Sequence, residues 1–350
     1  MFRNQSDTPS LNPTRLITGS QLAQEEHIRR LAPGQRSRYL PRMVYLTYQG
    51  EEEIGVQKAR EFLKSNPRVV AIVGDINSQG TRLLANLAQE FNLFHVSFFA
   101  TDESIFIEHQ FSFSYRERIS NETNALFTII HEHLGVTAPV FLVNDLLNLT
   151  SRWQDLSQVL VAANQTTPEV IATNRNQSDF SQELERINQL GQSIDSIVVF
   201  LSTQQHQHFL QQAAIHQVQV PIILSGVSLD PDHFLEFSGL DLEMYSFTFR
   251  YFLDLYDNSN PTLEQFAQRY QIAMGLRRVD SLGPWIYDGM LLLLESLALD
   301  PTGLTLKDNF SRIHHNRLVG TVSFNAEGNL AQNTFVPIRL KQGGISELFP

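Results

Sequence analysis

The chain has 350 residues, of which 42% are hydrophobic, enough to bury two domain-sized cores and too many for a disordered chain. Asp and Glu number 37 against 26 Lys and Arg, and this net charge of −11 excludes a general nucleic-acid binder, which needs cations for phosphates. Cysteine is absent, which excludes disulfides, thiolate metal sites and a cysteine nucleophile.

The N-terminal residues up to about 18 are polar and irregular, and they lack the apolar stretch of a secretory signal. We expect residues 1–38 to form an irregular segment with a first helix. The most apolar run of the chain, Met290 to Leu299, contains Glu295 and Ser296 and is too short to span a membrane. On these grounds the chain either stays in the cytoplasm or begins inside a longer reading frame.

After this segment, short apolar runs alternate with amphipathic helical stretches. The runs are rich in β-branched and aromatic residues, which is typical of strands covered on both faces of a parallel sheet. In chain order they are Val69–Val73, Phe94–Phe99, Val140–Val143, Ile197–Leu201 and Val220–Leu224. Helical spacing of apolar residues and capping signals predict helices over Glu52–Ser65 and Thr81–Phe91, and helices that begin at Ser151, Ser181 and Thr262.

The alternation of strand and helix requires parallel sheets with right-handed crossovers. It occurs twice, with changes of character near residues 113–120 and 245–253, so we predict an α/β fold of two Rossmann-like lobes. Lobe 1 is expected to comprise residues 39–113 and 247–318, and lobe 2 residues 114–246 and 319–350. At the C-terminal end we expect a hairpin of Val319–Phe324 with Thr334–Leu340.

Polar residues that follow two predicted strands are candidates for a binding site. The stretch Gly74–Thr81 links a strand to a helix, and such a turn offers free N–H groups and the positive end of a helix dipole to an anion. The stretch Ser97–Thr101 ends the next predicted strand. Ligands of open α/β sheets bind outside the carboxyl ends of strands, so Ser78 and Thr101 can hold a polar head group. Helix capping is the alternative role for these hydroxyls.

Motifs for catalysis or metal binding are not found. The histidine pairs at 131 and 133, 206 and 208, and 314 and 315 lack the further ligands of a tetrahedral metal site. No nucleophile elbow, dinucleotide fingerprint or P-loop occurs. We therefore expect no metal, no cofactor and no enzyme activity, and an α/β enzyme is the least favoured reading of the chain.

The order of several motifs resembles the type I periplasmic solute-binding proteins, specifically the group that binds Leu, Ile and Val. The similar stretches extend over roughly residues 39 to 345. They are Arg42–Gly50, Val69–Ser78, His95–Thr101, Phe111–Arg116, Ser178–Ser181, Ile286–Gly289 and Gly320–Gly328. The resemblance implies two lobes, joined by three crossovers, that close like a hinge on a small polar molecule. The family's first strand is missing or unrecognisable in residues 1–38.

The resemblance also implies a site. Ser78, Ala100 and Thr101 match the family positions that hold the ligand's backbone atoms. The ligand-binding residues that we predict are Asn77, Ser78, Ser97, Ala100, Thr101, Ser225 and Tyr287. Lobe 2 departs from the family pattern, because Leu149 stands in place of an aromatic residue and residues 225–228 contain no acid. A buried ammonium group would lack a partner there, which disfavours an ordinary zwitterionic amino acid.

Two functions stay open at this point. The first is non-catalytic binding of a small, amino-acid-like solute, as the substrate-binding component of an ABC transporter or as a ligand sensor, located outside the cytoplasm by the resemblance. The second is a degenerate domain that serves interaction or sensing in a larger signalling assembly. The expected partners are a small-molecule ligand and an ABC permease or a signalling domain, without nucleic acid.

Overall fold

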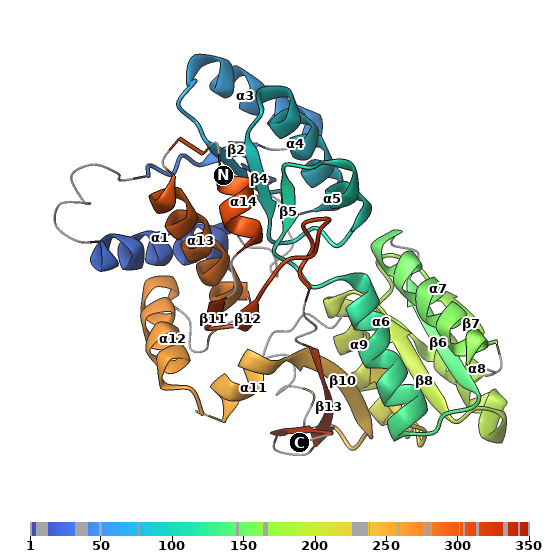
Figure 1. Cartoon of the computed structure of the whole chain (residues 1–350). Helices are drawn as coiled ribbons and strands as arrows, with labels where there is room; N and C mark the ends of the chain where they lie inside the picture. Colours follow the sequence, from blue (N-terminus) through green and yellow to red (C-terminus); the bar gives the residue numbers. More distant parts are fainter. Residues whose placement is uncertain are drawn as a thin grey trace. The chain divides into compact units, whose positions relative to one another are not determined.

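A computed structural model describes most of the chain. The residues that it describes are 2–4, 13–31, 41–48, 51–75, 77–144, 147–163, 167–225, 237, 239–257, 259–275, 279, 282–300, 302–303, 305–312, 315–331, 335–341 and 344–348. The chain divides into two compact units, and each unit is built from two separate stretches (Figure 1). Unit 1 comprises Met1–Arg118 and Asp254–Thr334, and unit 2 comprises Ile119–Leu253 and Phe335–Pro350.

Unit 1 contains short strands and most of the helices that are drawn in blue and orange in Figure 1. Its first stretch holds β1 (Phe2–Asn4), α1 (Pro13–Arg30), β2 (Leu46–Tyr48), α3 (Glu52–Ser65), β3 (Ala71–Val73), α4 (Ser78–Phe91), β4 (Phe94–Ser97), α5 (Ser104–Glu108) and β5 (Ser112–Ser114). Its second stretch holds α12 (Pro261–Met274), α13 (Leu282–Leu299), α14 (Leu306–Ser311), β11 (His315–Arg317) and β12 (Gly320–Val322). Helix α11 (Arg250–Tyr256) spans the division between the units.

The parallel pairs of unit 1 place the carboxyl ends of neighbouring strands together. Strand β4 lies between β3 and β5 in a three-stranded parallel sheet, and β1 pairs with β2 in parallel. Helices α3 and α4 pack on β3 through a cluster of buried apolar residues that includes Val56, Leu63, Ile72, Leu84 and Leu87. This burial explains why the 3.6-residue spacing of apolar positions forms helices here.

Unit 2 is built on one seven-stranded sheet with the strand order β14-β13-β10-β9-β8-β6-β7. The elements are α6 (Ile119–Phe127), a π-helix (Thr128–His133), β6 (Pro139–Asn144), α7 (Leu147–Ala162), β7 (Glu169–Thr173), α8 (Ser181–Leu190), a 3₁₀ turn (Gly191–Ser193), β8 (Ser196–Phe200), α9 (Thr203–Ile215), β9 (Ile222–Leu224), β10 (Met244–Phe249), β13 (Phe335–Lys341) and β14 (Gly344–Glu347). The strands from β7 to β10 pair in parallel, whereas β13 pairs antiparallel with both β10 and β14.

The apolar runs are confirmed as strands, and the helix from Glu52 to Ser65 has the predicted bounds. Two predicted helix starts are wrong. Ser151 lies inside α7, which begins at Leu147. Helix α12 begins at Pro261, because the Asn260 side chain accepts hydrogen bonds from the N–H groups of Thr262 and Leu263, at 3.1 and 3.2 Å. An Asn N-cap followed by proline fixes the start of this helix more strongly than the threonine two residues later.

The predicted C-terminal hairpin is wrong. Residues 320–322 pair with β11 in unit 1, whereas residues 335–341 pair with β10 and β14 in unit 2. Phe324 is held in unit 1 by Phe113 and Phe310, with ring centroids 5.5 and 4.8 Å apart, and Ser114 N donates to Gly328 O at 2.8 Å. The chain therefore leaves unit 1 after residue 334, later than the expected position 318. The other two divisions between the units, after residues 118 and 253, also come later in the chain than the expected positions 113 and 246.

Two expectations about single elements are also corrected. The N-terminal region does contain a strand, β1, which pairs with β2 in the register Phe2 to Leu46. Three residues are too few to show the alternation by which a strand is recognised in a sequence. Helix α13 is long and apolar enough to span a membrane by length and composition, but 72% of it is buried inside the protein, as in a core helix.

Candidate functional site

Two of the predicted stretches meet at one edge of unit 1. Strands β3 and β4 are parallel neighbours, with Val73 opposite Val96, so the residues that follow them leave the sheet on the same side. Thr81 Oγ1 of the first stretch lies 3.3 Å from Ser97 Oγ of the second. Arg82, the next residue of α4, donates to Asp102 at 2.8 Å and to Ser104 Oγ at 2.7 Å, just beyond the second stretch. The expected proximity of the two βα turns therefore follows from the strand order.

Ser78 and Thr101 keep their hydroxyl groups available at this edge. Ser78 is the first residue of α4, Thr101 follows the turn after β4, and both side chains are half-buried. Within the described part of the chain, neither hydroxyl has a hydrogen-bond partner in the protein. Two such hydroxyls at the carboxyl ends of adjacent parallel strands can donate to or accept from a polar ligand.

Asn77 serves the start of α4. Its Oδ1 accepts a hydrogen bond from Gly80 N at 2.7 Å, and its Nδ2 donates to Glu52 Oε1 at 3.0 Å. The first bond is that of an N-cap and satisfies a backbone donor that the helix itself leaves free. The predicted ligand contact of Asn77 thus competes with two bonds inside the protein.

Replacing Asn77 with alanine is expected to lower the free energy of unfolding by about 1 kcal/mol, because the N-cap bond is lost. Asn77→Ser is the matched control, since its hydroxyl can still accept from the helix. Urea unfolding followed by far-UV circular dichroism measures both variants. Equal stability of Asn77→Ala and the wild type would contradict the capping role.

Ser97 and Ala100 shape the turn that carries Thr101. Ser97 is fully buried, its Oγ accepts from Ala100 N at 3.1 Å, and it lies 3.3 Å from Thr81 Oγ1. Ala100 is buried against Ala85, Ile105 and Phe106. Both predicted residues therefore lie beside the edge, but their side chains contact the protein.

A buried histidine that the sequence does not single out holds the other turn, the one between β3 and α4. His95 lies on β4, its Nε2 donates to Gly74 O at 2.5 Å, and its Nδ1 lies 3.0 Å from Ser112 Oγ. Burial lowers the pKa of His95 to about 4, so the imidazole is neutral in the fold. A histidine between two apolar residues of a strand, Phe94 and Val96, was the available signal for it.

Two other predicted residues lie elsewhere. Tyr287 is buried on α13, and its ring centroid lies 4.6 Å from that of Phe266 on α12. Burial, followed by the charge of Glu26 on α1, raises its pKa to about 12. These contacts place the Tyr287 side chain in the helical layer of unit 1.

Ser225 belongs to unit 2. It follows β9, its N donates to Val199 O at 2.9 Å, and its buried Oγ has no hydrogen-bond partner among the described residues. Nearby strand ends of unit 2 carry amides, since Asn144 Nδ2 donates to Gln205 Oε1 at 2.6 Å. The side chain of Leu149 and residues 226–236, which include most of the 225–228 stretch, lie outside the described part.

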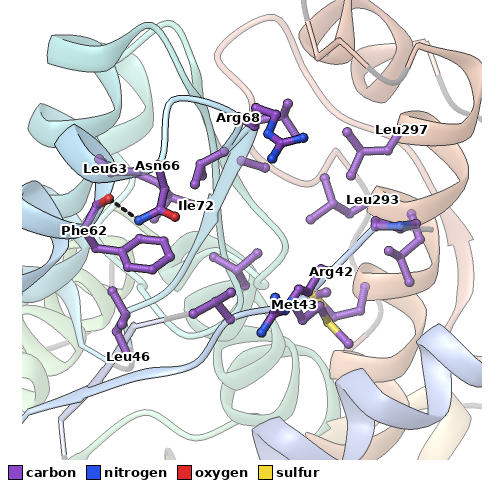
Figure 2. Close-up of a pocket in the computed structure, with 18 of the residues that line it drawn as sticks. Arg42, Met43, Leu46, Phe62, Leu63, Asn66, Arg68, Ile72, Leu293 and Leu297 are labelled. Carbon is purple, nitrogen blue, oxygen red and sulfur yellow. Dashed lines mark hydrogen bonds between the residues drawn. The ribbon is translucent and has the colours of Figure 1, made fainter. Parts of the chain in front are cut away.

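A pocket of about 600 Å³ lies beside β3 in unit 1 (Figure 2). Its lining is mainly apolar and includes Met43, Leu46, Leu63, Ile72, Leu293 and Leu297. None of the predicted ligand-binding residues lines it. Among the described residues, no group of three His, Asp or Glu side chains could hold a metal ion.

The sequence was compared with known families. Residues 41–342 match the family model described as the receptor family ligand binding region. The chain belongs to this family. No curated protein matches it in sequence.

Solved structures that share its fold extend over nearly the whole of this receptor-family chain. A leucine-binding protein, LivK of Thermotoga maritima, is similar with a TM-score of 0.76 and 15% identity, over 99% of this chain and 96% of that one. LivJ of Streptococcus pneumoniae, solved with isoleucine, has a TM-score of 0.74 and 15% identity, over 100% of this chain and 98% of that one. A solute-binding protein of R. palustris, solved with benzoate, has a TM-score of 0.74 and 15% identity, over 99% of this chain and 94% of that one. The predicted type I periplasmic binding-protein fold is confirmed.

Proposed function

We propose that this protein binds a small polar, amino-acid-like solute without chemical conversion. The observation that carries the proposal is the pair of available hydroxyls, Ser78 and Thr101, at the carboxyl ends of adjacent parallel strands. Membership of a ligand-binding family supports it. The two hydroxyls would hold the ligand's polar head. Ser97 holds the turn that carries Thr101, and His95 holds Gly74 in the turn that leads to Ser78.

The proposed setting is outside the cytoplasm, with an ABC permease as the partner that receives the solute. Structures with the same fold support this setting, since one is the solute-binding protein of an ABC transporter and another the substrate-binding protein of a branched-chain amino acid transporter. One of them holds isoleucine and another benzoate, so a shared fold accommodates chemically different small solutes. The ligand of this chain therefore has to be found by experiment.

The test starts with a thermal-shift screen of wild-type protein against small metabolites, including leucine, isoleucine and benzoate. A ligand that binds only the native state raises the melting temperature. Against the ligand identified, the double variant Ser78→Ala/Thr101→Ala is expected to lose about tenfold or more in affinity by calorimetry, because two hydrogen bonds are lost.

Thr321→Ala is the control, since Thr321 is an exposed threonine of β12 in the same unit. It is expected to bind like the wild type. Unchanged affinity of the double variant would remove both hydroxyls from the site. A screen without any ligand would contradict the proposed function itself.

A further inference from the structure

A carboxylate of the protein already occupies the start of α4. Asp75 is only 2% exposed, and its carboxylate accepts a hydrogen bond from the Tyr48 hydroxyl. It lies directly against Gly80 in the first turn of α4, where any larger side chain would collide with it. The backbone holds it there as well, because Asp75 N donates to Thr81 Oγ1 at 3.1 Å.

The N-terminus of a helix is the place where an anionic ligand would be stabilised, by free N–H groups and by the helix dipole. In α4 the N–H of Gly80 is taken by Asn77 Oδ1, and the positive end of the dipole faces the carboxylate of Asp75. The protein's own groups thus supply the acceptor and the negative charge that a ligand's carboxylate would otherwise bring.

Two further acidic residues of the described part, Glu52 and Glu53, act in the same direction. Burial raises the pKa of the Tyr48 hydroxyl, and its hydrogen bond to Asp75 and the charges of Asp75, Glu52 and Glu53 raise it further. Arg82, one turn into α4, is neutralised by its bonds to Asp102 and Glu108. Arg82 therefore brings no unpaired positive charge to the start of α4.

We infer that the proposed site at Ser78 and Thr101 takes a head group without negative charge, an amide, a hydroxyl or an ammonium, and that Asp75 is the residue that rejects carboxylates. The inference rests on the function proposed above and specifies its substrate class. A buried charge is poorly screened by salt, so Asp75 acts on a ligand that it does not touch.

The test uses matched probes that differ in the head group alone, L-leucine with L-leucinamide and benzoate with benzamide. Thermal shift and calorimetry are measured with the wild type and with Asp75→Asn, whose amide can still accept from Tyr48. We expect Asp75→Asn to gain about tenfold or more in affinity for a carboxylate probe, with little change for its amide, because one repulsive charge is removed.

Two variants separate charge from packing. Tyr48→Phe removes the hydrogen bond and keeps the charge of Asp75, and Glu53→Gln removes an exposed charge of α3. Neither is expected to gain carboxylate binding as Asp75→Asn does. A gain with Tyr48→Phe equal to that with Asp75→Asn would assign the effect to packing and overturn the inference.

The inference is overturned as well if Asp75→Asn gains no affinity for either carboxylate. If the variant does not fold, wild-type protein alone still tests the inference. Tighter binding of a carboxylate probe than of its matched amide by the wild type would overturn it. These results leave the proposed function standing wherever the Ser78→Ala/Thr101→Ala variant loses its ligand, so the two failures can be told apart.

Discussion

Replacing Trp285 with alanine is expected to lower the free energy of unfolding by about 3–5 kcal/mol, the cost of removing a large aromatic side chain from a packed core. Trp285 is 1% exposed on α13, its ring centroid lies 5.3 Å from that of Tyr115, and its Nε1 donates to Tyr115 O. Tyr115 directly follows β5, so this contact ties α13 to the end of the sheet. Urea unfolding followed by far-UV circular dichroism measures the loss.

Trp285→Phe separates the contribution of ring packing from that of the hydrogen bond to Tyr115 O. The phenyl ring keeps most of the packing and loses the N–H, so the loss should be about 1–2 kcal/mol, from the buried Tyr115 carbonyl left without this donor. Trp153→Phe is the control in unit 2, where Trp153 is half-buried on α7, and its effect should be smaller. A loss below about 1 kcal/mol for Trp285→Ala would contradict the core role.

Asp288→Asn is expected to make the protein more stable than the wild type at high pH but not at low pH. Asp288 is 1% exposed, and its Oδ2 accepts from Val319 N at 2.8 Å. Burial raises its pKa to about 7, although the N–H groups of Val319 and Leu318 and the charge of Arg317 act in the opposite direction. In the unfolded chain the pKa is near 3.8.

The direction of this pH dependence follows from proton linkage. Because the folded pKa is the higher one, the contribution of Asp288 to stability is complete below about pH 4 and is lost as the pH rises through about 7. Asparagine stays uncharged, so its advantage over aspartate should grow by about 3–4 kcal/mol between these limits. Urea unfolding at about pH 5, 6 and 8 measures it.

The contributions of other titrating groups to the free energy of unfolding cancel when the variant is compared with the wild type. His95, for example, has a lowered pKa, so its contribution is present above about pH 6.5 and is lost as the pH falls toward 4. Asp300→Asn is the control of opposite sign, since hydrogen bonds from Thr302 and Thr305 lower the pKa of Asp300. Parallel curves of stability against pH for Asp288→Asn and the wild type would refute the prediction.

The sequence predicts the buried parallel strands well, because a continuous apolar run needs no knowledge of its neighbours. Strand β5 is different, since two of its three residues are serines. Its Ser112 is satisfied by His95, a contact between strands that no local pattern contains. The predicted hairpin fails for a related reason, because the partner of each strand is decided by packing in different units.

The same distinction applies to the site. The position of Ser78 and Thr101 at one edge follows from strand order, which can be predicted from the alternation of elements. The partners of Asn77 and Ser97 depend on how α3 and β4 pack against α4, through Glu52 and Thr81. The sequence therefore locates the edge but does not separate hydroxyls available to a ligand from polar groups that hold the turn.

The discontinuous units impose an order on folding during synthesis. Residues 119–253 contain β6 to β10, a connected parallel sheet that can form before the ribosome has made β13 and β14. In unit 1, by contrast, α1 packs against α13, which emerges only after all of residues 119–253. We expect nascent unit 1 to expose the apolar face of α1 for most of translation, which makes it the part that needs a chaperone.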